Sequence, residues 1–339
     1  MPISPITNIQ SPQIIRIGGG AAMGTGQILN QLGLYKPLIV TDKVLVKLGQ
    51  LEKLLKILDQ SNISWSVFDE TIPEPTDVCL SNGIDMFRSG NFDCVVGFGG
   101  GSSLDMAKAI SAMSKNPGHV RNYKQPAQIN RTGVPIILLP TTAGTGSELT
   151  KWCVITDTKF SVKYNLSGLA FLAAAAIIDW TFTTTKPDRL TADTAIDSLT
   201  HAIESFVSKK SSPFSDALAL NAMPLIAKNI RLAFNDPYNN RARESLMLGA
   251  SQAGMSFSNS SVALVHGMSR PIGAYFHIAH GLSNAILLAE VTNFSIAADE
   301  HKYAQCARVM EWASETDTNH QACQKPDSYT HLRAHETDS

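Results

Sequence analysis

The stretch Asp93–Lys108, DCVVGFGGGSSLDMAK, predicts a strand that runs into a glycine-rich turn and then into a helix. Glycines after a strand let the backbone approach an anion closely, and the N–H groups at the start of the next helix attract phosphate. The stretch lacks the Gly-Lys-Ser/Thr ending of a P-loop, and Ser102 stands where the usual dinucleotide fingerprint has its third glycine. A tight turn without a ligand is the alternative interpretation.

Strand-like and helix-like segments alternate on both sides of this stretch. Apolar runs at Pro37–Asp42, Ile63–Glu70 and Val134–Pro140 are strand candidates, while Lys47–Gln60 and Val78–Arg88 have helical spacing. Near-continuous apolar strands that alternate with helices indicate a parallel sheet covered on both faces. We therefore expect an α/β domain in the first half of the chain.

The pattern changes to helix alone from about Thr191, after Pro187 and Asp188 interrupt it. The segments with helical spacing are Thr191–Lys209, Pro213–Phe234 and Asn240–Phe257. We expect an α/β domain over residues 1–188 and a helical domain from residue 189 onward.

Composition and charge exclude several classes of partner. Of 339 residues, 44% are hydrophobic and 17% charged, and the net charge of −1 provides no basic field for nucleic acid or an anionic membrane. Five scattered cysteines without a CxxC pair are typical of a reducing compartment. The start MPISPITNIQ lacks a signal-peptide pattern, and the apolar run Leu169–Trp180 is too short to span a bilayer. We expect a cytoplasmic protein.

A second loop of small hydroxyl residues, Pro140–Glu148, follows another predicted strand. Two such loops at the carboxyl ends of parallel strands favour one shared ligand in the crevice there. Asp42 ends an earlier strand, where an acid accepts the ribose hydroxyls of an adenosine and repels a 2′-phosphate, so NAD is favoured over NADP. The alternative for Asp42 is a helix cap or a turn.

Four residues have the chemistry of a transition-metal site. Asp197 and His201 are four apart on one predicted helix face, and His266 and His280 stand in apolar, glycine-marked surroundings where an unpaired ring is costly. One carboxylate and three imidazoles suit Fe²⁺ or Zn²⁺, and they match Ca²⁺ or Mg²⁺ poorly. A surface pair on a helix is the alternative for Asp197 and His201. The pair His331 and His335 lies in the polar tail and is read as solvated.

With these motifs assembled, the chain resembles the iron-containing alcohol dehydrogenase family over roughly residues 10–325. The resemblance rests on motifs in the family's order: VTD at Val40–Asp42, GGGSSLDMAK at Gly99–Lys108, LPTTAGTGSE at Leu139–Glu148, DSLTHAIE at Asp197–Glu204, HGMSRPIG at His266–Gly273 and HGLSNAILL at His280–Leu288.

The resemblance implies a dehydroquinate synthase-like architecture, in which a Rossmann-like domain precedes an all-helical one and a cleft holds NAD(P) and one metal ion. It places the metal ligands at Asp197, His201, His266 and His280, with iron favoured over zinc. Its cofactor contacts fall on Asp42, Gly100, Gly101, Ser102, Thr141, Thr142 and Lys163, and Trp152 matches residues that line the substrate pocket. The implied reaction interconverts a small alcohol and its aldehyde or ketone by hydride transfer, with the metal as Lewis acid on the substrate oxygen. Homodimers are common in the family.

The sequence departs from the family pattern at the expected proton relay. Many members carry a histidine where this chain has Arg270, and an arginine cannot act as a base at neutral pH. Arg270 is therefore predicted to hold a substrate carboxylate or cofactor phosphate, and His277 is the nearest substitute for the relay. A packed or solvated histidine is the alternative for His277.

The resemblance ends near Cys323–Lys325, although the family continues with further helices. We expect a truncated reading frame with an appended tail over residues 326–339, which would expose apolar surface and lower stability. Two other functions stay open from the residues: an inactive fragment that still binds a dinucleotide, and a lyase resembling dehydroquinate synthase.

Overall fold

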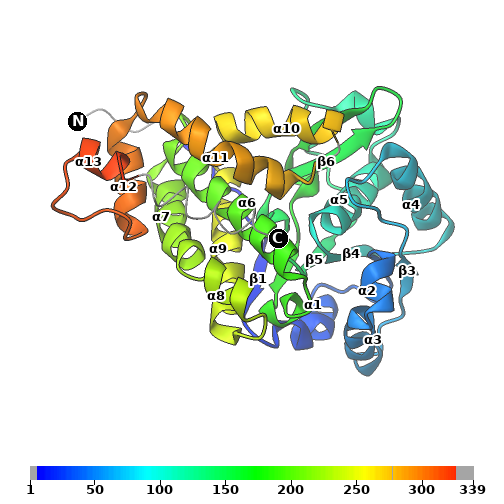
Figure 1. Ribbon diagram of the computed structural model, residues 1–339. Helices are drawn as coiled ribbons and strands as arrows, with labels where there is room; N and C mark the ends of the chain where they lie inside the picture. Colours follow the sequence, from blue (N-terminus) through cyan, green and yellow to red (C-terminus); the bar gives the residue numbers. More distant parts are fainter. Residues whose placement is uncertain (1–5, 277, 326–339) are drawn as a thin grey trace. The chain divides into compact units, whose positions relative to one another are not determined.

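The computed structural model describes residues 6–276 and 278–325, and the chain divides into two compact units (Figure 1). Ser11–Lys186 form the first unit, and the described residues of Met1–Gln10 and Pro187–Ser339 form the second. Gln10 joins the second unit through Asn259, whose side chain accepts the Gln10 N–H at 2.8 Å and donates to the Gln10 carbonyl at 3.1 Å.

The first unit is built on a six-stranded parallel sheet, which confirms the predicted parallel sheet. Its strand order is β1-β8-β5-β4-β2-β3. The strands are β1 (Ile14–Ile17), β2 (Pro37–Val40), β3 (Ser66–Phe68), β4 (Cys94–Gly99), β5 (Ile136–Pro140) and β8 (Ala175–Ile178). The predicted apolar runs contain β2 to β5, whereas β1 and β8 were not predicted. A separate antiparallel hairpin of β6 (Trp152–Asp157) and β7 (Val162–Ser167) was also not predicted.

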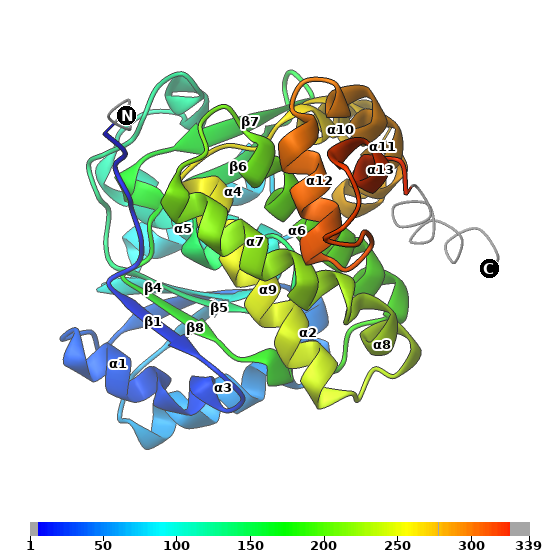
Figure 2. The same cartoon turned by 90° about the vertical axis from the view of Figure 1, so that its left-hand side faces the viewer.

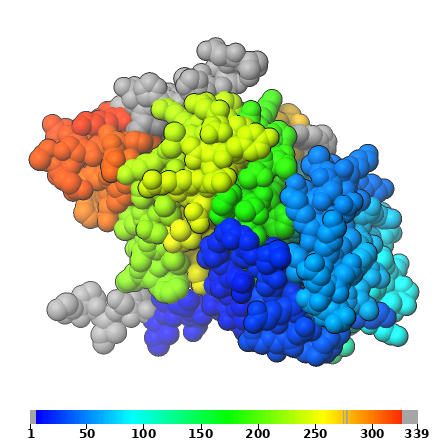
Figure 3. All heavy atoms as spheres, turned by 90° about the horizontal axis from the view of Figure 1, so that it is seen from below, coloured from blue at the N-terminus to red at the C-terminus, as the bar shows by residue number. Residues whose placement is uncertain are grey.

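Helices cover both faces of the sheet. Successive residues of a strand point to opposite faces, and on the central strands the residues on both faces are apolar. The helices are α1 (Thr25–Gln31), α2 (Lys43–Lys47), α3 (Gln50–Gln60), α4 (Asp77–Ser89) and α5 (Gly101–Lys115). Figure 2 shows α4 and α5 on one face of the sheet and α1 and α3 on the other. On β4, Val95 belongs to the core on the α4 and α5 side, and Val96 to the core on the α1 and α3 side. Seen from below, the blue residues of the α1 and α3 layer form one continuous surface (Figure 3).

Short 3-10 helices connect these elements, at η1 (Ala21–Gly24), η2 (Val120–Tyr123), η3 (Ser147–Leu149), η4 (Leu169–Phe171) and η5 (Trp180–Thr183). One predicted helix boundary was wrong. The expected helix Lys47–Gln60 is interrupted at Gly49, whose φ of 66° lies in the left-handed region and ends the helical path between α2 and α3.

The second unit is helical, and the predicted class of an α/β unit followed by a helical one is confirmed. Its helices are α6 (Asp188–Val207), α7 (Pro213–Ala227), α8 (Ile230–Asn235), α9 (Asn240–Ser258), α10 (Leu264–Phe276), α11 (His280–Ile296), α12 (Glu300–Val309) and α13 (Asn319–Cys323). The predicted helix Pro213–Phe234 breaks between α7 and α8. Within the described ranges, no helix combines the length and apolarity that crossing a bilayer requires.

Candidate metal centre

The central helix α6 places Asp197 and His201 in the interior of the helical unit. It packs against α7, α9 and α11, so that the stretch Ala195–Phe206 is buried on every side. Asp197 is 3% exposed and His201 is 6% exposed. The alternative interpretation of a surface pair is therefore wrong, because neighbouring helices cover the face that carries both side chains.

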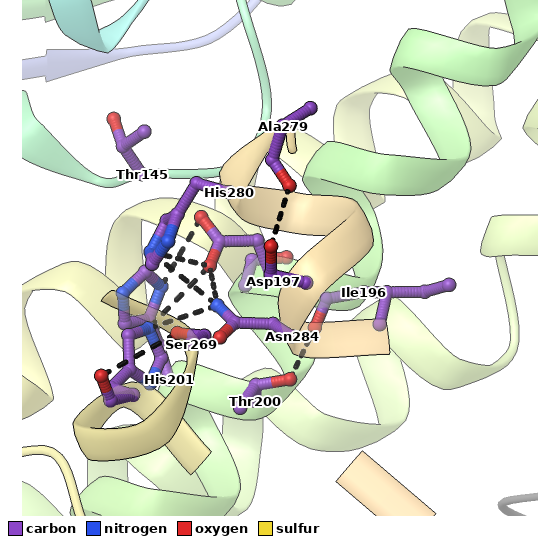
Figure 4. Close-up of polar contacts among 12 residues, drawn as sticks. Thr145, Ile196, Asp197, Thr200, His201, Ser269, Ala279, His280 and Asn284 are labelled. Atoms are coloured by element: carbon purple, nitrogen blue, oxygen red, sulfur yellow. Dashed lines mark hydrogen bonds and ion pairs between the residues drawn. The ribbon is translucent and has the colours of Figure 1, made fainter. Parts of the chain in front are cut away.

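Two further helices bring histidines to the same place (Figure 4). His266 lies in the first turn of α10, and His280 is the first residue of α11. The Asp197 Oδ1 atom is 3.5 Å from His266 Nε2 and 3.6 Å from His280 Nε2, and Asp197 Oδ2 is 3.9 Å from His201 Nδ1. The rings of His201 and His266 stack with centroids 4.3 Å apart.

These spacings fit a single metal ion. Ligand atoms about 2.1 Å from an ion and at tetrahedral angles lie about 3.4 Å from one another. One ligand atom each from Asp197, His201 and His266 lies within 4.8 Å of the other two. The buried Nδ1 atom of His201 has no hydrogen-bond partner among the described residues, although such an atom is costly without one. This donor set is one that divalent first-row ions prefer.

The protonation states of Asp197 and His201 also suit a cation. Burial lowers the pKa of His201 to about 3, although Asp197 acts in the opposite direction. Burial works against the charge of Asp197, but His201 and His280 hold the pKa of that carboxyl well below its ordinary value. A neutral imidazole and an ionised carboxylate are the forms that bind metal.

Glu204 orients His266 and was not predicted as a functional residue. Its buried carboxylate accepts the backbone N–H of Val265 at 2.5 Å and lies 2.7 Å from His266 Nδ1. In the neutral form that binds metal, Glu204 thus favours the proton on Nδ1 of His266 and leaves the Nε2 lone pair for the ion. Burial lowers the pKa of His266, but Asp197 and Glu204 outweigh it and raise that pKa. The spacing of Asp197, His201 and Glu204 at i, i+4 and i+7 on one helix face was the available signal.

Two glycines follow histidines of the site, and only one of them is tightly packed. A Cβ atom on Gly281 would lie 2.4 Å from the Asp193 carbonyl oxygen of α6, whereas a Cβ atom on Gly267 would meet nothing within 4 Å. The bare backbone at Gly281 thus allows the start of α11, which carries His280, to approach α6.

We expect Gly281→Ala to lower the free energy of unfolding by about 1–3 kcal/mol, as overpacking does, and to weaken metal binding because His280 is displaced. The matched control Gly267→Ala is expected to stay within about 1 kcal/mol of the wild type. Urea denaturation and chelator competition measure both quantities. Equal effects from the two variants would contradict a packing requirement at Gly281.

In the α/β unit, the glycine and threonine loops lie side by side at the ends of β4 and β5. Gly100 and Gly101 form the start of α5, and a Cβ atom on Gly101 would lie 2.7 Å from Thr145 Cγ2. The N–H of Thr141 donates to Gly99 at 2.9 Å, and its buried Oγ1 has no hydrogen-bond partner within the described residues. Thr142, in the same loop, is half-buried.

Three other predicted cofactor residues have side-chain partners within the protein. Asp42 caps α2, where its Oδ1 accepts two backbone N–H groups. Ser102 Oγ accepts the N–H of Glu74 at 3.3 Å, and Lys163 forms an ion pair with the Glu74 carboxylate at 2.5 Å. The half-buried Trp152 begins β6.

Of the two residues considered for the expected proton-relay position, the structure describes only Arg270. Arg270 is half-buried on α10, one helical turn after His266; burial lowers its pKa, and Glu204 acts in the opposite direction. His277, His331 and His335, and the predicted tail 326–339, lie outside the described residues.

A buried lysine of α5 forms hydrogen bonds with the segment that follows β5. The Nζ of Lys108, on α5 and fully buried, donates to Ser147 Oγ at 2.8 Å and to the Trp152 carbonyl at 2.9 Å, and also reaches Thr150. Asp105, one turn earlier, accepts from Ser147 Oγ at 2.7 Å and from the Val154 N–H at 2.8 Å. Burial lowers the pKa of Lys108 and raises that of Asp105.

Two family models cover almost the whole chain. One, described as iron-containing alcohol dehydrogenase, matches residues 12–180, and the other, described as the C-terminal part of the Fe-containing alcohol dehydrogenase family, matches residues 191–334. The second match extends past Lys325, where the sequence motifs end.

Individual proteins show the same likeness. The chain is 35% identical to the NAD-dependent methanol dehydrogenase of Bacillus methanolicus over 305 residues, which cover 90% of this chain and 80% of that protein. It is 36% identical to the lactaldehyde reductase of Escherichia coli, over 86% of this chain and 77% of that one. A solved 1,3-propanediol oxidoreductase superposes with a TM-score of 0.94 at 34% identity, covering 97% of this chain and 86% of that structure.

Proposed function

The chain belongs to the iron-containing alcohol dehydrogenase family and is an NAD-dependent oxidoreductase acting on alcohols, and we propose that its substrate is a small alcohol, interconverted with its aldehyde or ketone. The observation that carries the proposal is the buried Asp–His–His cluster of the helical unit. Relatives named for methanol, 1,3-propanediol and lactaldehyde support a small substrate.

We propose that His280 completes the ligand set of Asp197, His201 and His266, because its Nε2 is as close to Asp197 Oδ1 as that of His266. A divalent ion bound there supplies Lewis acidity, which lowers the pKa of a hydroxyl beside it. Glu204 keeps the His266 lone pair directed at the ion. Iron is the proposed metal, and because the same donors accept zinc, metal analysis of the purified protein decides between them.

The proposed NAD contacts are Asp42, Gly100, Gly101, Ser102, Thr141, Thr142 and Lys163. Bound NAD supplies the hydride acceptor. The N–H groups at the start of α5 suit a pyrophosphate, and the unpartnered Thr141 hydroxyl is a donor for it. The two backbone bonds of Asp42 use Oδ1, so a ribose hydroxyl would meet Oδ2. This carboxylate supports a preference for NAD over NADP.

Near the reacting groups, Trp152 is proposed to line the substrate pocket, and Arg270 to hold a carboxylate or phosphate, since a guanidinium cannot accept a proton at neutral pH. His277 stays the predicted proton relay. The domains are proposed at residues 1–188 and 189–325, with a separate tail at 326–339. A cytoplasmic homodimer is proposed, and the buried free thiols, such as Cys94 and Cys306, are typical of a reducing compartment.

The test is to strip the protein with a chelator, reload it with Fe²⁺ without oxygen or with Zn²⁺, and follow NADH absorbance. Short alcohols are offered with NAD⁺, and short aldehydes with NADH. We expect turnover after reloading and none in the stripped protein. NADH binding without turnover under either metal would instead support an inactive dinucleotide-binding fragment.

A further inference from the structure

The side chain of Asn284 lies where the metal-binding atoms converge (Figure 4). It is on the second turn of α11 and fully buried. Its Nδ2 atom is 2.6 Å from Asp197 Oδ1, 3.2 Å from His266 Nε2 and 3.4 Å from His280 Nε2. Its Oδ1 atom is buried without a hydrogen-bond partner among the residues described. The amide nitrogen therefore lies within hydrogen-bond distance of three of the ligand atoms, and its two N–H groups can serve two of them at a time.

The lone pairs of the acceptors determine which of these contacts a metal ion can tolerate. A neutral imidazole has one acceptor nitrogen with a single lone pair, whereas a carboxylate oxygen has two. In neutral His266 with its proton on Nδ1 toward Glu204, the Nε2 atom is the acceptor, and that lone pair serves either Asn284 or a metal ion. Asp197 can bind an ion and still accept the Asn284 N–H, so only that bond is compatible with a loaded site.

We propose that Asn284 is a positioning residue of the metal centre. Before a metal ion binds, its amide N–H groups hold Asp197 and His266 at the separations that coordination requires. On metal binding, the bond to His266 is released and the bond to Asp197 keeps the carboxylate oriented. The inference rests on the metal centre described above and assigns Asn284 no contact with substrate.

Two substitutions test this role with Zn²⁺ as the probe on the full chain. Asn284→Leu keeps the branched shape but removes both donors, and we expect Zn²⁺ affinity to fall by about 10–100-fold, as it does when a partner of a ligand is lost. Asn284→Asp keeps the shape but sets a second carboxylate beside Asp197. We expect it to lower the unfolding temperature of the metal-free protein and to raise Zn²⁺ affinity by about tenfold, because affinity rises with ligand charge.

Chelator competition gives the affinities, and thermal unfolding with and without Zn²⁺ gives the stabilisation by metal. The matched control is Asn259→Asp, which changes another buried asparagine of the helical unit, one that bonds Gln10 and Met255. It is expected to lower the unfolding temperature but to leave the Zn²⁺ affinity unchanged.

An unchanged affinity in Asn284→Leu is the result that a residue which only fills space would give, and it overturns the proposal. If Asn284→Leu does not fold, Asn284→Ala also removes the donors, and an unchanged affinity in that variant overturns the proposal. A wild-type protein that binds no Zn²⁺ would contradict the metal centre itself, so the two failures are distinguishable.

Discussion

Glu204→Gln is expected to weaken Zn²⁺ or Fe²⁺ binding by about 10–100-fold, the usual loss when the partner of a metal-binding histidine is changed. The glutamate accepts three bonds at once: Oε1 accepts the Val265 N–H, and Oε2 accepts the backbone N–H and the Nδ1 of His266. Glutamine has one acceptor oxygen, so its amide N–H₂ must face either the Val265 donor or the two His266 donors. His266 then loses either its orientation or the tautomer that leaves Nε2 free for metal.

Chelator competition on the stripped protein measures this effect. The matched control is Glu300→Gln, which changes a glutamate of the same unit that pairs with a histidine, His320, at an exposed position. That variant is expected to bind metal as the wild type does and to change stability by less than about 0.5 kcal/mol. Unchanged affinity in Glu204→Gln would show that Glu204 does not orient His266.

Lys108→Met is expected to lower the free energy of unfolding by about 3–5 kcal/mol, the cost of removing one partner of a buried ion pair. The substitution leaves Asp105 without its counter-charge and removes the donor from the Ser147 and Trp152 carbonyls. The lost interactions hold the segment that follows β5, so we expect this segment to become the first part of the α/β unit to open.

Urea denaturation gives the loss, and hydrogen exchange locates it. The control Lys115→Met removes an exposed lysine from the last turn of the same helix, and is expected to cost less than about 0.5 kcal/mol. In the double variant Asp105→Asn with Lys108→Met no charge is left unpaired, so it should be more stable than Lys108→Met alone. If Lys108→Met were as stable as Lys115→Met, the proposed stabilising role of the buried Lys108 would be refuted.

The sequence by itself determined the alternation of strands and helices and the chemistry of the metal site. Apolar runs such as Pro37–Val40 are buried on both faces, and such a run predicts a buried strand without knowledge of its neighbours in the sheet. Asp197, His201, His266 and His280 were found because carboxylate and imidazole are rare in apolar surroundings and occur in spaced motifs. These properties are local, because each motif lies within a short window of the chain.

The tertiary structure alone decided which side chains meet. Glu204 contacts His266 from 62 residues away, and Asn284 contacts Asp197 from 87 residues away. Neither residue type indicates a metal site in the sequence, because a glutamate or an asparagine on a helix is ordinarily solvated. Asp42 caps a helix and Lys163 pairs with Glu74, contacts that depend on neighbouring segments. Hydrogen bonds depend on distance and direction, and both are set only when the helices pack against one another.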